Sequence, residues 1–294
     1  MICVAFFGTS SFAVPLFEAL LKDVRFSVVV AVTQPDRPVG RKQVLTAPPV
    51  KQIAIANGIP VLQPERLRHP EAVAALRAYV FDTAIVASYG QILSQEVLDM
   101  APQRFLNLHG SLLPKYRGAS PIAEAIKQGD EQTGVTVMVM DALMDHGPML
   151  STHAIGIDPH DTTETLSDKL ARLGADAMPD VVAKYLAGEL ASREQDHAQA
   201  TTCKLLKKEA GIVDPLTLSA DALERLVRAY TPWPNVTLTV HGTRVKVLRA
   251  HVGEPTPNTC AVPCQQGTLI LDEVRPEGGS TMSGEAFLRG RTRS

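Results

Sequence analysis

Apolar positions in the first half of the chain form short runs that alternate with segments in which apolar residues recur at helical spacing. Runs typical of buried β-strands occupy residues 2–7, 28–32, 60–62, 83–87, 105–109 and 135–140. Segments with helical spacing occupy residues 12–21, 50–57, 71–79, 95–100 and 121–128. Strands that alternate with helices in this way build a parallel sheet with helices on both faces. The pattern therefore predicts an α/β, Rossmann-like, doubly wound domain.

A long helical segment follows over residues 161–186, and Gly174 and Pro179 are points where this helix could break. Residues 189–203 are polar and follow no period, so we interpret them as a linker. We therefore expect the first domain to cover residues 1–188.

Beyond this linker, the pattern changes to short strands separated by turns. A helical segment at 219–229 comes first. It is followed by runs of strand-forming residues at 236–240, 244–250 and 269–274. Short strands joined by turns are typical of a small β-barrel. We expect a second domain of this type over residues 204–294.

Composition excludes several classes of protein. The N-terminus lacks the basic segment and long apolar core of a signal peptide. No apolar run approaches the roughly 18 residues that a membrane span needs. The cysteines are too few and too scattered for a disulfide framework or a metal site. We expect a monomeric cytoplasmic protein with free thiols, no metal, no membrane contact and no obligate protein partner.

The net charge of −2 hides a difference between the two parts of the chain. Residues 1–203 hold 17 Lys and Arg against 22 Asp and Glu, whereas residues 204–294 hold 12 against 9. A basic C-terminal part on an acidic body favours a polyanionic partner, and the alternative is an ordinary solvated surface.

Candidate chemistry begins at the predicted strand 105–109. Asn107 and His109 are two residues apart there, so their side chains share one face. Asp145 lies in a glycine-containing turn after the strand predicted at 135–140, and neighbouring parallel strands end at the same edge of a sheet. We therefore expect Asp145 to reach His109 and to keep its ring charged and oriented. A charged imidazole and an amide donor that face one point can stabilise an oxyanion.

This set of residues contains no activated nucleophile. Ser111 is adjacent, but it lacks the Gly-x-Ser-x-Gly turn of serine hydrolases. Direct transfer of an acyl group to an incoming amine therefore fits better than covalent catalysis. The alternative for Asn107 and His109 is a polar strand end with a hydrogen-bonded histidine.

Basic residues concentrate in two further segments, a proline-containing loop near residue 37 and a cluster that opens the C-terminal part. Each segment is either a solvated surface or a place where phosphates bind. The candidate phosphate contacts are Arg37, Arg41, Lys42, Lys204, Lys207 and Lys208.

Residues 107–122, together with the turn at 145–147, resemble the signature of the 10-formyltetrahydrofolate-dependent formyltransferases. The resemblance implies catalytic roles for Asn107, His109 and Asp145. It also implies a folate-binding loop after the strand and a second segment whose backbone holds the pterin. The folate-binding residues implied in this way are Ser111, Leu112, Leu113, Pro114, Tyr89, Gly90, Gln91 and Ile92.

Other segments resemble the branch of this family that formylates methionyl-tRNA. They are residues 33–41, 49–51, 228–234 and 282–290. The resemblance covers the chain nearly from end to end. It implies a Rossmann-like N-terminal domain and an OB-like C-terminal barrel that helps to hold tRNA. It also implies 10-formyltetrahydrofolate as co-substrate, no metal, and initiator methionyl-tRNA as partner, with the basic residues named above as tRNA contacts.

Three places depart from the pattern of the family. His146 stands where the family usually has a small residue, so it could compete for the Asp145 carboxylate. Residues 211–215 replace a familiar Ile-Asp-Trp run, and residues 41–44 are less basic than the usual loop. We expect local differences at the entry to the barrel and weaker contacts to the acceptor end of the tRNA.

Two other functions remain open at this stage. The chain could formylate a small amine, such as glycinamide ribonucleotide or an amino sugar, although such enzymes need no basic C-terminal barrel. It could also be an RNA-binding module without catalysis, although the intact set of Asn107, His109 and Asp145 argues against that.

Overall fold

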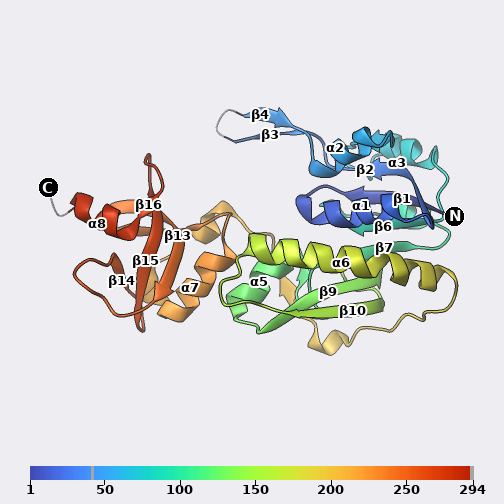
Figure 1. Cartoon of the computed structure of the whole chain (residues 1–294). Helices are drawn as coiled ribbons and strands as arrows, with labels where there is room; N and C mark the ends of the chain where they lie inside the picture. Colours follow the sequence, from blue (N-terminus) through green and yellow to red (C-terminus); the bar gives the residue numbers. More distant parts are fainter. Residues whose placement is uncertain (41–42, 292–294) are drawn as a thin grey trace. The chain divides into compact units, whose positions relative to one another are not determined.

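The computed structural model describes residues 1–40 and 43–291, which divide into two compact units (Figure 1). The first unit holds residues 1–119, 134–155 and 167–202, and the second unit holds the remaining described residues. The domain boundaries expected near residues 188 and 203 stay a prediction.

The first unit is built on a seven-stranded sheet in the order β10-β9-β7-β6-β1-β2-β5 (Figure 1). Its strands are β1 (Ile2–Gly8), β2 (Phe26–Val32), β5 (Val61–Leu62), β6 (Thr83–Ala87), β7 (Phe105–His109), β9 (Gln132–Val139) and β10 (Met149–Gly156). The five neighbouring strands β7, β6, β1, β2 and β5 are parallel to one another. The α/β, Rossmann-like architecture that the hydrophobic pattern predicts is therefore confirmed.

Strand β9 is the exception to the parallel arrangement. It runs antiparallel to β7, with Asn107 opposite Met138 and His109 opposite Thr136. A strand that is buried on both faces has one continuous apolar run whichever way it points, so the pattern in residues 135–140 carries no direction. The expectation that β7 and β9 end at the same edge of the sheet is therefore wrong.

Strand β10 has no counterpart in the sequence prediction. It lies at the edge of the sheet beside β9, and beyond Leu150 its residues alternate between half-buried and exposed positions. Polar residues such as Ser151 and His153 interrupt its apolar pattern. Because an edge strand with a solvated face needs no continuous apolar run, its signal in the sequence is weak.

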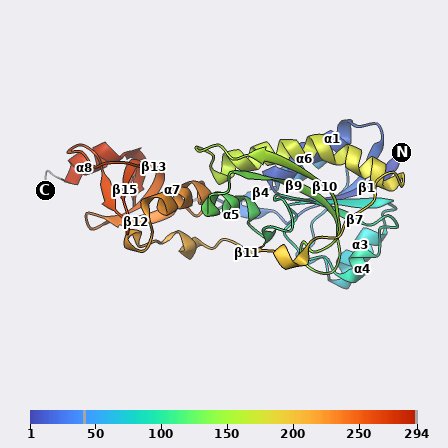
Figure 2. The same ribbon diagram turned by 90° about the horizontal axis from the view of Figure 1, so that it is seen from below.

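Helices cover both faces of this sheet. They are α1 (Val14–Lys22), α2 (Pro49–Ala56), α3 (Pro70–Arg77), α4 (Gln95–Leu98) and α6 (Thr163–Leu186). Helix α5 (Pro121–Gln128) belongs to the second unit. In Figure 2, α1 and α6 lie on one side of the sheet, whereas α3 and α4 lie on the other. Shorter elements are the hairpin of β3 (Arg37–Val39) and β4 (Val44–Thr46), the paired β8 (Arg117–Gly118) and β11 (Thr202–Cys203), and the 3-10 helices η1 (Ser11–Ala13) and η2 (His197–Gln199).

Helix α6 is continuous, so it does not break at Gly174 or Pro179, the two points where the sequence allows a break. A Cβ atom at Gly174 would overlap Cδ2 of Leu108, so the glycine lets α6 pack closely against β7. Leu108 is buried between Asn107 and His109 on the opposite face of the strand. The packing of α6 therefore supports the strand that carries both polar residues.

An aromatic cluster forms much of the core beside this strand. The ring centroids of Phe7 and Phe105 lie 5.3 Å apart. Tyr89 meets Phe7 edge-on, with ring centroids 5.5 Å apart. Pairs of this geometry add about 0.5–1.5 kcal/mol to the gain from burying the rings. They join β1, β7 and the turn after β6.

The second unit contains a curled antiparallel sheet in the order β12-β13-β15-β14, with β16 paired to β15. Its elements are η3 (Lys208–Gly211), η4 (Pro215–Thr217), α7 (Ala220–Ala229), β12 (Val236–Val240), β13 (Thr243–Val252), β14 (Ala261–Pro263), β15 (Thr268–Pro276), β16 (Met282–Ser283) and α8 (Gly284–Arg291). The pairing of β13 with β15 shifts register twice between Val247 and Ala250, and irregularities of this kind bend a sheet.

This curled sheet is a half-barrel, which confirms the OB-like fold. Ser219 caps the N-terminus of helix α7, and its Oγ accepts a hydrogen bond from the Ala222 amide at 3.2 Å. The sequence pattern did not predict β14, β16 or α8. Across both units, none of the helices in the described part of the chain has the length and apolar character that crossing a bilayer requires.

Candidate active site

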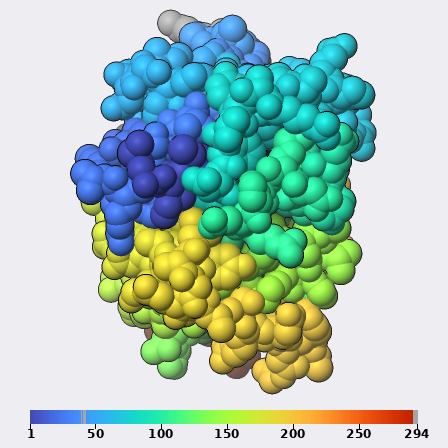
Figure 3. Space-filling view, turned by 90° about the vertical axis from the view of Figure 1, so that its right-hand side faces the viewer, coloured from blue at the N-terminus to red at the C-terminus, as the bar shows by residue number. Residues whose placement is uncertain are grey.

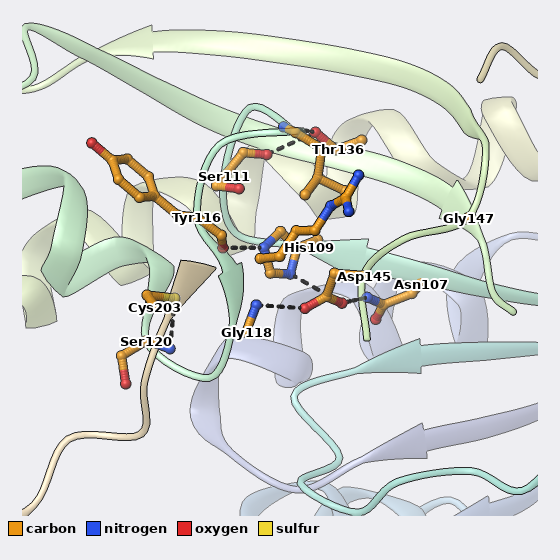
Figure 4. Close-up of polar contacts among 12 residues, drawn as sticks. Asn107, His109, Ser111, Tyr116, Gly118, Ser120, Thr136, Asp145, Gly147 and Cys203 are labelled. Atoms are coloured by element: carbon orange, nitrogen blue, oxygen red, sulfur yellow. Dashed lines mark hydrogen bonds and ion pairs between the residues drawn. The ribbon is translucent and has the colours of Figure 1, made fainter. Parts of the chain in front are cut away.

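Strand β7 presents two polar side chains to one face of the sheet. Asn107 is 8% exposed and His109 is 6% exposed, so both need hydrogen-bond partners inside the protein. Both side chains point toward Asp145, which belongs to the loop that joins β9 to β10 (Figure 4). The burial of β7 on both faces is what makes these two polar residues unusual.

The Asp145 carboxylate is the point on which these residues converge. Its Oδ2 accepts a hydrogen bond from the Gly118 amide at 2.8 Å. Its Oδ1 lies 3.4 Å from Nδ2 of Asn107 and 3.5 Å from Nδ1 of His109 (Figure 4). One oxygen is therefore held firmly by the backbone, and the other faces two donors at longer distances.

Asp145 reaches His109 by a different route from the one expected. Because β9 is antiparallel to β7, its last residue, Val139, lies beside Leu106 near the start of β7. Residues 140–148 then fold back, and the loop carries Asp145 to the two polar side chains. A returning loop between antiparallel strands, rather than a shared strand edge, brings the residues together.

The two ring nitrogens of His109 have different partners. Nε2 lies 3.0 Å from the Tyr116 carbonyl oxygen, and because a carbonyl only accepts, Nε2 is the donor. Nδ1 faces the Asp145 carboxylate, which is also an acceptor. Both ring nitrogens of His109 therefore face acceptors, Nε2 the Tyr116 carbonyl and Nδ1 the Asp145 carboxylate.

The backbone of Asp145 is held in an unfavourable conformation. Its φ angle is +49°, in the left-handed region that residues other than glycine rarely adopt. Such a conformation costs of the order of 1–3 kcal/mol and persists only where neighbouring contacts enforce it. Contacts around Asp145 therefore hold its carboxylate in place although the backbone conformation is unfavourable.

His146 does not compete for the Asp145 carboxylate, so that expectation is wrong. Its Nδ1 lies 2.7 Å from Oδ2 of Asp141, and its ring stacks on His197 with centroids 4.2 Å apart and planes 5° from parallel. The stack and the contact with Asp141 direct His146 away from the carboxylate next to it in the chain.

The loop at 111–114 is fixed from within. Ser111 is fully buried, and its Oγ donates to the Lys115 carbonyl at 2.6 Å, so the hydroxyl is not free to act as a nucleophile. Thr136 of β9 donates to the Ser111 carbonyl at 2.7 Å and accepts from the Leu113 amide at 3.0 Å. Sequence reasoning missed Thr136, because a threonine inside an apolar strand carries no motif.

The segment after β6 is anchored by the side chain and carbonyl of Tyr89. The ring is 2% exposed, and burial raises the pKa of the Tyr89 phenol. The Tyr89 carbonyl accepts hydrogen bonds from Oγ1 of Thr9 at 2.9 Å and from Nε2 of Gln34 at 3.2 Å. The Tyr89 side chain is part of the core, so any contact of this residue with a ligand would come from its backbone.

Gln91 and Ile92 point in different directions in the same segment. The Gln91 side chain accepts from the Leu67 amide at 2.8 Å and donates to the Pro64 carbonyl at 2.9 Å, so it ties the segment to its neighbour. Ile92 is 76% exposed. The preceding Gly90 has a φ angle of +85°, a turn that a residue with a side chain would strain.

The basic residues predicted to contact phosphates have separate surroundings. Arg37, on the hairpin of β3 and β4, pairs with Glu65 at 2.7 Å. Arg41 and Lys42 lie outside the described residues. The remaining three, all exposed, are Lys204, Lys207 and Lys208.

A half-buried group of polar side chains anchors the base of this hairpin. Nζ of Lys51 lies 2.8 Å from both oxygens of Asp36, and Nε2 of Gln63 donates to the same carboxylate at 2.8 Å. The Lys51 ammonium and, after it, the Gln63 amide hold the pKa of the Asp36 carboxyl below its usual value. The residue that precedes the hairpin, Asp36, is therefore held in place by Lys51 and Gln63.

Within residues 1–40 and 43–291, no group of three or more His, Cys, Asp or Glu side chains has the arrangement of a metal site. The cysteines are free thiols. Burial raises the pKa of Cys260 and of Cys264, which disfavours the thiolate form.

Two family models match most of the chain. Residues 1–182 match formyl transferase, and residues 205–292 match formyl transferase, C-terminal domain. The methionyl-tRNA formyltransferase of Chloroflexus aggregans is 44% identical over 98% of this chain and 96% of its own length. That of Myxococcus xanthus is 40% identical over 98% of this chain and 94% of its own length.

Solved structures share the fold at lower identity. The sugar 3N-formyl transferase WlaRD matches with a TM-score of 0.68 and 16% identity over 94% of this chain and 98% of its own. HypX from Aquifex aeolicus, in complex with tetrahydrofolic acid, matches with a TM-score of 0.64 and 14% identity over 98% of this chain, which spans 47% of HypX. Through both family models and its curated relatives, the chain belongs to the methionyl-tRNA formyltransferase branch of the formyl transferase family.

Proposed function

We propose that this chain transfers the formyl group of 10-formyltetrahydrofolate to the amino group of initiator methionyl-tRNA, which gives the N-formylmethionyl-tRNA that initiates translation. The convergence of Asn107, His109 and Asp145 carries the proposal, because it supplies two donors and a carboxylate without a nucleophile. Curated relatives at 40% and 44% identity are methionyl-tRNA formyltransferases, which favours this acceptor over a small amine. The reaction takes place in the cytoplasm and needs no obligate protein partner.

The folate co-substrate fits the loops that follow β6 and β7. These strands are parallel neighbours, so their loops meet at one edge of the sheet. Ile92 offers an exposed apolar side chain to a flat pterin ring. Within residues 1–40 and 43–291, no hydrogen bond engages the backbone amides of Gln91 and Ile92, so these donors are available to the polar edge of the ring. The folate-binding loop at 111–114 supports the other side of the folate.

Asn107 and His109 stabilise the charge that develops during transfer. When bound, the folate supplies the formyl carbon; the neutral amine forms a bond to it, the bond to the folate nitrogen breaks, and that nitrogen takes up a proton. Asn107 Nδ2 and His109 Nδ1 both face Oδ1 of Asp145, at 3.4 and 3.5 Å, so a formyl oxygen placed beside that carboxylate oxygen lies within reach of both donors as it becomes negative. The Tyr116 carbonyl holds Nε2, which leaves Nδ1 for this task.

Asp145 serves both partners of the reaction. Its charge keeps His109 protonated at Nδ1, and its Oδ1 accepts the proton that the amine loses, directly or through a water molecule. Oδ2 stays bound to the Gly118 amide, so the carboxylate keeps its orientation while Oδ1 exchanges partners.

The basic residues supply the surface for tRNA. Phosphate contacts orient a nucleic acid without reading its bases, and lysine and arginine are suited to them. The proposed contacts are Arg37, Arg41, Lys42, Lys204, Lys207 and Lys208.

The acceptor is tested by supplying labelled 10-formyltetrahydrofolate with one candidate acceptor at a time. The panel contains initiator methionyl-tRNA, elongator methionyl-tRNA, uncharged tRNA and glycinamide ribonucleotide. We expect the label on initiator methionyl-tRNA. Label on glycinamide ribonucleotide alone would replace the proposed acceptor with a small amine, and no label on any acceptor would contradict formyl transfer.

The role of Asp145 is tested with Asp145→Asn. The amide cannot take the amine proton and no longer holds His109 in its charged form, so we expect the single-turnover rate to fall about a hundredfold or more. Asp176→Asn removes the same charge from an exposed position on α6 and serves as the control. Near-full activity of Asp145→Asn would exclude this role.

A further inference from the structure

Gln195 is an unusual residue in the segment that follows α6. The sequence pattern of this segment is that of a linker, yet Gln195 is only 4% exposed. In the space-filling view of Figure 3, the segment after α6, drawn in yellow to gold, forms part of the outer surface of the first unit. A primary amide that is buried there must find partners for its donors and its acceptor.

The side-chain amide of Gln195 finds these partners in two other loops. Its Nε2 donates to the carbonyl oxygens of Asp145 at 2.9 Å and of Gly147 at 2.8 Å. Its Oε1 accepts from Nε of Arg117 at 3.0 Å and from Nη2 at 2.6 Å. The amide therefore joins the loop that carries Asp145 to the short strand β8.

Strand β8 also holds the side-chain carboxylate of Asp145. Gly118, next to Arg117 in the chain, donates its backbone amide to the Asp145 carboxylate. The Arg117 guanidinium is itself held from a second side by Nδ1 of His197 at 2.8 Å. The carboxylate of Asp145 is thus fixed by the backbone of β8. Its main chain is fixed directly by Gln195, whose amide is oriented by the side chain of Arg117.

We propose that Gln195, oriented by Arg117, is a positioning residue for Asp145 in formyl transfer. The inference rests on the proposed function. Asp145 has a φ angle of +49°, which an unrestrained loop would relax. The two hydrogen bonds from Gln195 reach the carbonyls on either side of His146, so they act on the strained turn itself. Loss of these bonds releases the turn and moves the carboxylate relative to His109.

The expected effect follows from the sensitivity of catalysis to small displacements. A shift of about 1 Å at a reacting group can cost about a hundredfold in rate. Gln195→Met keeps the length of the side chain and removes the amide. We expect it to lower kcat by about tenfold to a hundredfold, while the KM values for the tRNA and the folate change little, because Gln195 is buried and its amide bonds to protein groups.

The experiment compares full-length variants in the formylation of initiator methionyl-tRNA. Gln199→Met is the matched control, because Gln199 is an exposed glutamine in the same segment that bonds only to Asp196 in the described structure. Gln195→Glu is a second variant that keeps the acceptor for Arg117 but replaces the donor that faces the two carbonyls. Thermal midpoints show which variants remain folded.

A double variant separates positioning from a general effect on stability. If Gln195 acts through Asp145, Gln195→Met in an Asp145→Asn background lowers the single-turnover rate by less than twofold or so, although it lowers the wild-type rate at least tenfold. Equal losses in both backgrounds, or an unchanged kcat in both Gln195 variants, would overturn the inference. A wild-type chain that does not formylate methionyl-tRNA would instead contradict the proposed function.

Discussion

At the scale of single residues, the ion pair between Arg37 and Glu65 limits a proposed tRNA contact. The two side chains are 58% and 66% exposed and lie 2.7 Å apart. An ion pair this exposed contributes at most about 1 kcal/mol. A phosphate of the tRNA can therefore displace Glu65, but it must compete with that carboxylate for the Arg37 guanidinium.

We expect Glu65→Gln to lower the KM for methionyl-tRNA about twofold to fivefold, because it removes the competing charge and leaves Arg37 in place. Glu96→Gln is the matched control, since Glu96 pairs with Arg77 at 2.9 Å with similar exposure and its loss changes the net charge equally. Initial-rate measurements with both variants test the prediction. An equal fall in KM for both would show a general charge effect and no specific role for Arg37.

The residues of the candidate site differ in how far the sequence could indicate them. Asn107 and His109 are evident because two polar residues at strand spacing are unusual in an apolar run. Gln195 is not evident from the sequence, because it lies in an aperiodic segment. It also bonds to main-chain carbonyls, which every residue has, so no sequence motif marks these partners. The same holds for the Tyr116 carbonyl and the Gly118 amide, whose roles do not depend on a side chain.

At the scale of elements, the pairing of β9 with β10 depends on Gly134. A Cβ atom there would overlap the His153 carbonyl oxygen and come within 2.6 Å of Cδ2 of Leu112. The first contact is with backbone, which cannot move without disturbing the sheet. Gly134 therefore couples the edge strand to the loop that is proposed to hold folate.

Gly134→Ala is expected to lower the free energy of unfolding by about 1–3 kcal/mol, because the added methyl group overpacks this junction. Thermal and denaturant unfolding measure the change. Gly156→Ala is the control, since Gly156 ends β10 with open space around its Cα and an ordinary φ angle. Equal stability of Gly134→Ala and wild type would mean that the strands separate at little cost.

The elements also show where a hydrophobic pattern is informative. The parallel strands β1, β2, β6 and β7 are buried and rich in apolar residues, so the pattern finds them. The pattern does not reveal β10, because every second residue of this strand beyond Leu150 is exposed. It does not reveal the direction of β9, because burial on both faces is the same for either direction. The presence of β10 and the direction of β9 both depend on which strands pair in the folded sheet, and the local sequence does not indicate this pairing.

At the scale of the whole molecule, the uneven distribution of charge predicts how tRNA binding responds to salt. The C-terminal part holds 12 Lys and Arg against 9 Asp and Glu, and the three lysines at its start are exposed. Phosphate contacts release counterions from the nucleic acid, so affinity falls as the salt concentration rises. The folate co-substrate makes no comparable series of phosphate contacts.

We expect the KM for methionyl-tRNA to rise steeply between low and physiological salt, while the KM for 10-formyltetrahydrofolate changes little. A variant with alanine at Lys204, Lys207 and Lys208 should show a higher KM and a shallower dependence on salt, with kcat nearly unchanged. Steady-state kinetics over a series of KCl concentrations measure both. If the triple variant kept the wild-type salt dependence, these lysines would not contact the tRNA.

The hydrogen bond between His109 and Tyr116 has a stereochemical consequence. With Nε2 committed to the Tyr116 carbonyl, the imidazole cannot turn over, and Nδ1 stays on the side of Asp145. In the proposed reaction, the oxygen of the flat formyl group then has one docking direction, and the amine must come from the carboxylate side. The enzyme therefore selects one of the two faces of a trigonal carbon, although the product has no stereocentre that would record the choice.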